Sequence, residues 1–136
     1  LQLIGRRHVR SNNSWMHNSQ RLVKGKDRCT LMIHPRDASR LGLQVADSAE
    51  ITSDCRQIVL PVEITEDIMP GVVSIPHGWG HDRDGTGQSV AAAHAGASIN
   101  DVLSDGDIDP LSGTSVLNGQ PVAVKVWRPE RQRKRA

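Results

Sequence analysis

The sequence predicts a mainly β domain, and three observations lead to this class. Short segments rich in Val, Ile and Leu alternate with Gly, Pro, Asp and Ser, the usual pattern of strands and turns. The chain has 136 residues, an ordinary length for one domain. It is 37% hydrophobic, with 12 glycines in addition, so a packed core can form although Phe and Tyr are absent.

The first half is expected to contain four strands and one helix. Residues 1–10 begin as a strand and end in a polar loop, and 30–34 form a short apolar strand. Residues 35–42 form a helix, because proline stands in its first turn and glycine at its end. Strands at 49–52 and 57–65 flank a turn, and Pro61 predicts that the second is an edge or bulged strand.

The second half is expected to contain two strands separated by a long connection. A turn at Pro70 and Gly71 precedes a buried strand at 72–75. Residues 76–120 are rich in Gly, Ser, Asp and Ala, with one short helix near 89–95 or 99–103, and connections this long are usually functional or mobile. A half-buried strand is predicted at 120–127. The domain therefore spans 1–127, and 128–136 are expected to be a basic, disordered tail.

The net charge of +2 conceals an uneven distribution. Residues 1–40 hold nine Lys or Arg and two acids (+7), 41–127 hold three and twelve (−9), and 128–136 hold five and one (+4). A basic front of this kind favours an anionic partner. The first residue is leucine, which fits a fragment of a longer chain or a processed product.

Several classes of protein are disfavoured. No stretch approaches the roughly 18–20 apolar residues of a membrane span, and no secretory signal is visible. Cys29 and Cys55 lack the spacing of a zinc site, so two reduced thiols in a cytoplasmic protein are expected. The paired acids Glu66 and Asp67 lie beside a turn and are interpreted as caps.

The first segment with functional chemistry is RRHVRSNNSWMHN at 6–18. Arginine presents a planar fork that matches phosphate oxygens, and Ser and Asn can bond phosphate, ribose or base edges. The segment suits a polyanion such as a nucleotide. The alternative is a solvated basic strand followed by an Asn-rich turn.

The second segment is PHGWGHD at 76–82, which follows a predicted strand. Glycines that alternate with large rings allow close backbone approach, and strand-end loops commonly hold ligands. A metal site of His77, His81 and Asp82 is the alternative. Paired His ligands at this spacing normally share a helix face, and Gly78 and Gly80 disfavour a helix, so no metal site is predicted.

The third segment combines 98–101 with DGDIDPLSG at 105–113. Its spaced acids could suggest calcium, but the EF-hand spacing and terminal Glu are missing, which favours an acidic surface loop. No nucleophile elbow, P-loop, zinc-protease motif or Rossmann glycine fingerprint occurs in the sequence. No catalytic residue is therefore predicted.

Together these segments resemble one family. The ordered set LIGRRHVRSNNSWMHN, LGL, LPVEITEDIMPGVVSIPHGWGH and an Asn followed by DPLSG is similar to the C-terminal molybdopterin-dinucleotide-binding domain of molybdopterin oxidoreductases. These enzymes form the dimethyl sulfoxide reductase superfamily, which includes formate dehydrogenases and nitrate reductases. The resemblance covers about residues 2–127.

The resemblance implies a six-stranded double-psi β-barrel that is the last domain of a large oxidoreductase. Such an enzyme carries molybdenum or tungsten on two pyranopterin guanine dinucleotides. The metal's protein ligand and any iron-sulfur cluster would lie in upstream domains of the same polypeptide, so the isolated chain would bind cofactor without catalysing the redox step. Substrate, oligomeric state and electron-transfer partner are not implied.

The family motifs and the residue chemistry together give a set of expected cofactor-binding residues. Arginines, hydroxyls and amides of the first segment would hold phosphate or pterin edges, and the rings would shape the pterin pocket. A proton relay at the pterin is a further hypothesis for His17 or His77. The expected set is Gly5, Arg6, Arg10, Ser11, Asn12, Ser14, Trp15, His17, His77, Trp79, Asn100 and Asp109.

Two positions depart from the family pattern. Ala46 stands where relatives usually have glycine, and Arg56 stands where a turn glycine is common. A positive φ at either position would strain the backbone.

Two other classes of function compete with this interpretation. A stand-alone barrel module could bind nucleic acid or a protein through its basic termini, since clustered Lys and Arg neutralise phosphates. The acidic body and the lack of spaced surface aromatics disfavour nucleic acid. A small self-contained enzyme would need a nucleophile or base with a partner, which the sequence does not offer.

Overall fold

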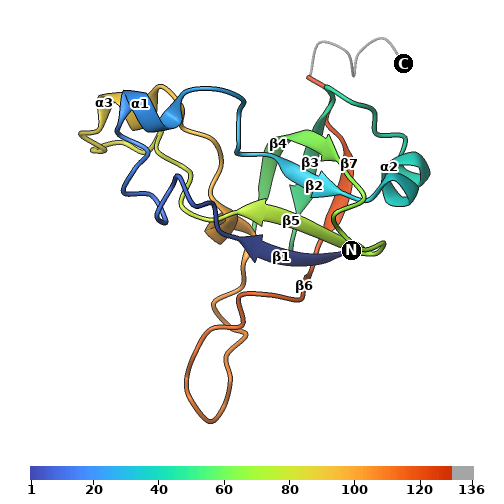
Figure 1. Cartoon of the computed structure of the whole chain (residues 1–136). Coiled ribbons are helices and arrows are strands. Elements are labelled where there is room, and N and C mark those ends of the chain that lie inside the picture. The colour runs from blue at the N-terminus through green and yellow to red at the C-terminus, as the bar shows by residue number, and fades with distance from the viewer. Residues whose placement is uncertain (130–136) are drawn as a thin grey trace.

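The computed structural model describes residues 1–129, in which seven strands form one sheet in the order β6-β1-β5-β2-β4-β3-β7 (Figure 1). The helices are α1 (Gln20–Val23), α2 (Pro35–Leu41), α3 (Ser89–Ala92) and the short 3-10 helix η1 (Ile99–Val102). The strands are β1 (Gln2–Arg6), β2 (Leu31–Ile33), β3 (Ser48–Thr52), β4 (Gln57–Ile64), β5 (Val72–Pro76), β6 (Gln120–Pro121) and β7 (Ala123–Val126).

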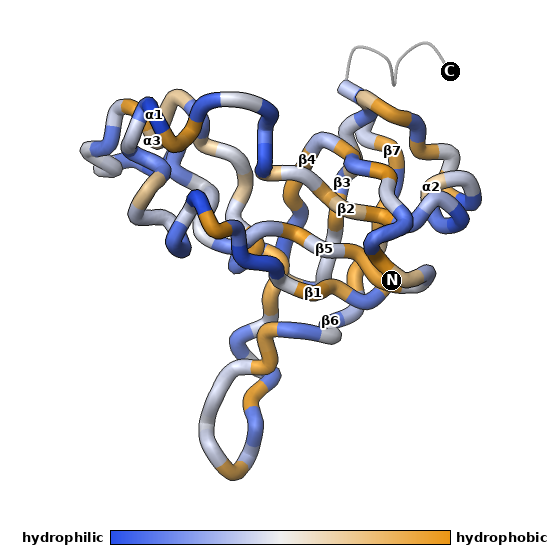
Figure 2. Tube along the Cα trace, in the orientation of Figure 1, coloured by the Kyte–Doolittle hydropathy of each residue, from blue (hydrophilic) through white to orange (hydrophobic). Residues whose placement is uncertain are grey.

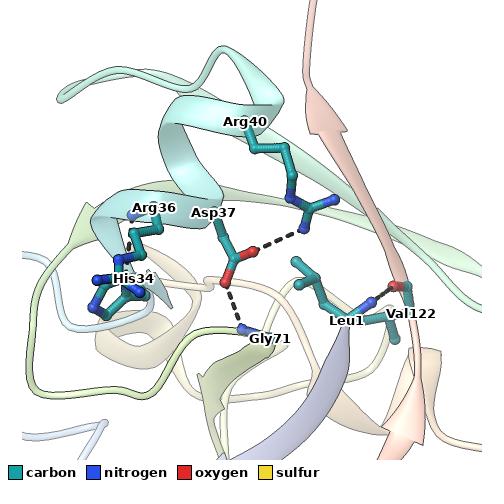
Figure 3. A network of polar contacts seen from close by, with 7 residues as sticks. All are labelled: Leu1, His34, Arg36, Asp37, Arg40, Gly71 and Val122. Carbon is teal, nitrogen blue, oxygen red and sulfur yellow. Dashed lines mark hydrogen bonds and ion pairs between the residues drawn. The ribbon is translucent and has the colours of Figure 1, made fainter.

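The sheet curves into a nearly closed barrel. Its two outer strands, β6 and β7, are consecutive in the sequence and are separated only by Val122. The amino terminus of Leu1 donates a hydrogen bond to the Val122 carbonyl (2.9 Å) (Figure 3). The Val122 N–H donates in return to the Leu1 carbonyl (2.8 Å). These bonds hold the start of β1 against Val122, the residue that connects the two outer strands β6 and β7.

The core fills the inside of this barrel. Strand β4 alternates exposed and buried residues along its length, the pattern of a strand with one face on a core. Figure 2 shows hydrophobic residues along the strands, whereas the loop after β1 is largely hydrophilic. The fully buried large side chains are Leu3, Leu31, Ile33, Ile51, Leu60, Val73, Ile75 and Val102.

Helix α2 is joined to the strands by one buried carboxylate. Pro35 occupies its first turn, and Gly42 ends it with φ 69°. Asp37 accepts hydrogen bonds from the Gly71 N–H (2.6 Å) and from Arg40 (2.8 Å) (Figure 3). These two bonds lower the pKa of Asp37. The ionised carboxylate thus ties the helix to the turn before β5.

The predicted mainly β class is confirmed, with differences in three elements. The single strand expected at 120–127 is divided at Val122 into β6 and β7, so there are seven strands instead of six. The long connection contains both α3 and η1, where one helix was expected. Helix α1 lies in a stretch for which no element was predicted. The basic tail falls almost entirely outside the described residues.

The expectation that Pro61 marks an edge or bulged strand is wrong about the edge, because β4 lies between β2 and β3. The N–H of Val62 donates to the Asp47 carbonyl beyond the start of β3 (2.9 Å). Successive backbone N–H groups of a strand point to opposite neighbours, so the Pro61 nitrogen faces β2. The pairing of β4 with β2 begins only at Leu31 and Val62, one residue after Pro61. No ladder bond is lost, so proline is tolerated.

Of the two departures from the family pattern, one gives a strained backbone. Ala46 has φ 74°, whereas Arg56 is not among the non-glycine residues with positive φ in the described part. Ala46 therefore adopts a left-handed conformation that glycine would adopt without a Cβ clash.

Within residues 1–129, no helix combines the length and apolar character that a membrane crossing requires.

Candidate cofactor-binding site

The site is built where two neighbouring strands end. Strands β1 and β5 are parallel, with Arg6 opposite Pro76, so the loops that follow them leave the same end of the barrel. The His77 N–H donates to the Arg6 carbonyl and continues the ladder (3.0 Å). Figure 1 shows the two loops running beside each other away from the barrel, toward α1 and α3.

The two loops approach closely at Gly78. An added Cβ there would lie 2.1 Å from the Asn13 carbonyl oxygen, and the residue has φ 96°. Asn12 and Asn13 also have positive φ, at 43° and 61°. Asn accepts this region better than most residues, so the Asn-rich turn fits around the glycine.

Three rings form a cluster between the loops, in which His17 and Trp79 are buried and His81 is half-buried. His17 is fully buried and stacks on Trp79 with ring centroids 3.9 Å apart. Its Nδ1 lies 2.8 Å from Nε2 of His81, so one ring donates a hydrogen bond to the other. Burial, and then the charges of His81 and Arg28, lower the pKa of His17 to about 4. The pair is therefore neutral near pH 7.

A cavity of about 250 Å³, which none of these three rings lines, opens where β1 and β5 end, and we call it the His77 cavity. Three of the expected binding residues line it, namely Gly5, His77 and Asn100. The Gly5 N–H donates to Oδ1 of Asn118, across the cavity wall (2.7 Å). The remaining lining residues are Arg7, Ile99, Leu103, Leu117 and Asn118.

A second cavity, of about 340 Å³, lies on the side of α1 and α3, and we call it the Arg28 cavity. Trp79 is the one expected binding residue that borders it. The two cavities have no lining residue in common. The Arg28 cavity is lined by Val23, Gly25, Lys26, Asp27, Arg28, Trp79, Ala93, His94, Ala95 and Gly96.

Arg6 makes its contacts within the domain. Its guanidinium donates to the Ser74 carbonyl (2.6 Å), the Thr30 carbonyl (2.8 Å) and the Thr30 hydroxyl (2.8 Å). Burial lowers the pKa of the Arg6 guanidinium, which the nearby Glu63 opposes. These bonds join β1 to β5 and to Thr30, which directly precedes β2, so Arg6 stabilises the strands from which the two loops leave. A role for Arg6 in binding phosphate stays a prediction.

The other expected residues divide by exposure. Ser11 is buried, Ser14 is half-buried, and Arg10 and Asn12 are exposed on the loop after β1. Trp15 is 82% exposed, so the loop offers a free indole. Asp109 lies in the extended loop before β6, where it accepts bonds from the Leu111 N–H and the Ser112 hydroxyl, and it lines neither cavity. These bonds lower the pKa of Asp109.

Buried polar atoms without partners mark the region as incomplete. Such atoms are Ser11 Oγ, His17 Nε2 and Trp79 Nε1. Buried polar groups are normally hydrogen-bonded, so each atom has capacity for a ligand or water. In the described part of the chain, no group of three or more His, Cys, Asp or Glu could hold a metal ion, and the His77, His81 and Asp82 alternative does not form one.

Comparison with known proteins identifies the family. The model of the "Molydopterin dinucleotide binding domain" matches residues 1–121. The chain belongs to this family. The matched residues include both loops and the His77 cavity, so this molybdopterin dinucleotide binding domain has its predicted binding residues inside the shared region.

Two reductases are among the curated relatives. ArrA, the molybdopterin-containing part of the arsenate respiratory reductase of Chrysiogenes arsenatis, is 29% identical over 85% of this chain and 14% of its own length. The dimethyl sulfoxide reductase DmsA of Escherichia coli is 30% identical over 62% of the chain and 10% of its own length. The chain thus spans a small part of these relatives.

A solved structure shows the same fold. Acetylene hydratase from Pelobacter acetylenicus aligns with a TM-score of 0.77 at 22% identity, over 92% of this chain and 18% of that protein. The region that matches this chain is thus a small part of a longer protein in all three cases.

Sequence reasoning missed several residues of the site. Arg7 and Asn118 line the His77 cavity, and His81 completes the ring cluster. Arg7 and His81 stand within the quoted motifs, whereas Asn118 is recognisable only from the pairing of β1 with β6. Arg28 and Lys26 contribute to the +7 charge of residues 1–40, but no motif distinguishes them from other surface cations.

Proposed function

We propose that this domain binds a pyranopterin guanine dinucleotide that carries molybdenum or tungsten, and that it acts as the C-terminal part of a larger oxidoreductase. The observation that carries the proposal is the His77 cavity within a domain of this family. Any iron-sulfur cluster and the metal's protein ligand would lie in upstream domains. When bound, the cofactor supplies the redox chemistry through its metal.

The His77 cavity fits a flat, polar heterocycle. Asn100 offers an amide that can both donate and accept, and His77 offers an imidazole at the same opening. Burial lowers the pKa of His77, and Arg7 lowers it further, so the ring is neutral near pH 7. Ile99, Leu103 and Leu117 supply an apolar wall that would exclude water from the ligand.

The loop after β1 would hold the other edges of the cofactor. Ser11 and His17 on this loop have unsatisfied polar atoms, as does Trp79 on the loop after β5. Ser14 and Asn12 also lie on the loop after β1. Arg7 and Arg10 would face the diphosphate, since a guanidinium matches phosphate oxygens. The basic charge of residues 1–40 serves the anionic cofactor in this proposal, and no nucleic-acid partner is required.

The remaining parts of the proposal concern the whole protein. Its partners would be the upstream domains of the same polypeptide, together with an electron carrier. We place it in the cytoplasm, on the ground of its two free thiols. His17 and His81 would keep a neutral hydrogen-bonded pair beside the pterin.

Hydrolysis of the purified protein tests the proposal. The protein is expressed from the complete reading frame that contains this chain, and its acid hydrolysate is assayed for guanosine monophosphate, molybdenum and tungsten. The expected result is guanosine monophosphate in a fixed ratio to one of the two metals. A protein that holds neither metal and releases no nucleotide would contradict cofactor binding, and a cytidine nucleotide would contradict the guanine form.

A further inference from the structure

Arg28 is a cation that the domain leaves without an acidic partner. One nitrogen, NH2, donates to the Leu22 carbonyl (2.9 Å), while Nε and NH1 are buried and have no partner. None of the ion pairs found within residues 1–129 includes Arg28. Arg28 as a whole is half-buried, but buried donor atoms are normally hydrogen-bonded, because removing them from water without a partner is costly.

The surroundings of Arg28 add to this imbalance. Burial, and then the charge of Arg10, lower the pKa of Arg28, and Asp27 is the acid that opposes them. Asp27 uses Oδ1 to accept a hydrogen bond from the Cys29 N–H (2.9 Å). The local field is therefore positive, and a negatively charged group nearby would be stabilised.

Arg28 lines the Arg28 cavity together with one acid, Asp27, and several groups that can donate hydrogen bonds. Lys26 brings a second cation, His94 brings an imidazole, and Gly25 and Gly96 leave backbone uncovered. Trp79, of which 7% is exposed, has a buried Nε1 that donates to nothing. At about 340 Å³, the cavity lies at the lower end of the roughly 300–1,000 Å³ typical of small-molecule sites.

One wall of the cavity is fixed by close backbone packing. Gly96 has φ 61°, and a Cβ there would lie 2.6 Å from Cys29 Sγ and 3.1 Å from a Trp79 ring carbon. The neighbouring Ala95 carbonyl accepts bonds from the N–H groups of Gly80 (2.8 Å) and His81 (3.2 Å). The cavity is therefore preformed, which reduces the entropy lost on binding.

We propose that the Arg28 cavity binds a phosphate-type oxyanion, with Arg28 and Lys26 as its cationic ligands. The cavity shares no lining residue with the His77 cavity. The oxyanion is either a free inorganic ion, which is independent of the proposed function, or the diphosphate of the proposed cofactor, in which case the inference rests on the proposed function. Both sources present the same oxygens to the guanidinium.

Titration of the 136-residue chain with inorganic diphosphate, at constant ionic strength, tests the proposal. Calorimetry gives the Kd, and NMR follows the Nε–H of Arg28 and the indole N–H of Trp79. The variants are Arg28→Gln and Lys26→Gln, with Arg56→Gln on the β3–β4 hairpin as the matched control. Arg28→Gln removes the bond to the Leu22 carbonyl and could disturb the fold. Lys26→Gln changes an exposed side chain, so it tests the cavity without that risk.

The expected result is saturable binding that shifts both resonances. Arg28→Gln should raise the Kd about tenfold or more, Lys26→Gln should raise it several-fold, and Arg56→Gln should leave it unchanged. Absence of binding at millimolar diphosphate, equal weakening by all three variants, or resonance shifts at Arg7 and His77 instead would overturn the proposal. Guanosine diphosphate in place of the probe separates the sources: tighter binding assigns a nucleotide phosphate, and weaker binding assigns a free oxyanion.

Discussion

Replacing Ala46 with glycine should stabilise the domain. Ala46 is exposed and has φ 74°, so its methyl group contributes no packing and clashes with its own backbone. A left-handed non-glycine residue costs about 1–2 kcal/mol. Glycine gives back about 0.4–1 kcal/mol through the greater entropy of the unfolded chain. The expected gain in the free energy of unfolding is therefore about 0.5–1 kcal/mol, or about 2–5 °C in Tm.

Urea unfolding of Ala46→Gly, followed by circular dichroism, measures this gain. The matched control is Gly42→Ala, because Gly42 has φ 69° and a Cβ there would contact nothing within 4 Å. Backbone strain and the same unfolded-chain entropy distinguish the two forms at that site, so Gly42→Ala should lose about 0.5–1 kcal/mol. Refutation would be an Ala46→Gly variant that is no more stable than the parent while Gly42→Ala is clearly destabilised.

Three further predictions concern the polar contacts that shape the fold and the site. Asp37→Asn should lower the free energy of unfolding by about 1–2 kcal/mol in urea at pH 7. Because the folded pKa of Asp37 lies below 3.8, the parent should lose this advantage as the pH falls through that pKa, and a constant difference would contradict the account. The pKa of His17 is about 4 in the folded state and 6.5 in the unfolded state, so the free energy of unfolding should fall by up to about 3 kcal/mol as the pH is lowered from 6.5 to 4. His17→Phe should flatten that pH dependence. Gly78→Ala should destabilise the domain by about 2 kcal/mol or more, since its Cβ would lie 2.1 Å from the Asn13 carbonyl oxygen. The control is Gly85→Ala, which lies in open space at φ 84° and measures the backbone cost alone. Equal losses of stability for the two variants in thermal melts would exclude the loop contact.

Local signals were sufficient for most elements of the fold. Proline and glycine bound α2 at the predicted ends, and the alternation of residues in β4 and the buried run in β5 mark strands that face a core. The position of β4 could not be predicted in the same way. Pro61 suggests an edge from its own chemistry, but its tolerance inside the sheet depends on where β2 begins, which is a tertiary fact.

The candidate site shows the same division. Gly5, His77 and Asn100 were predicted from motifs and share one cavity. The parallel pairing of β1 with β5 brings Gly5 and His77 together, and η1, which carries Asn100, approaches Gly5 through Ile99. Arg6 and Asp109 were predicted from the same motifs but make their contacts elsewhere. Arg6 donates to the Ser74 carbonyl on β5, and Asp109 accepts from the Leu111 N–H within a turn of the loop before β6. Residue type indicates what a side chain can bind, whereas direction and competing partners are set by the packed structure.

Cofactor retention by variants of the His77 cavity tests the central claim most directly. The full-length protein that contains this chain is purified in parent form and as His77→Ala, Asn100→Ala and Arg56→Ala, and metal and guanosine monophosphate are measured per polypeptide. We expect both contents to fall several-fold in the two cavity variants and to remain at the parent level in Arg56→Ala. Full retention in His77→Ala and Asn100→Ala, with unchanged folding, would contradict the assignment of this cavity to the cofactor.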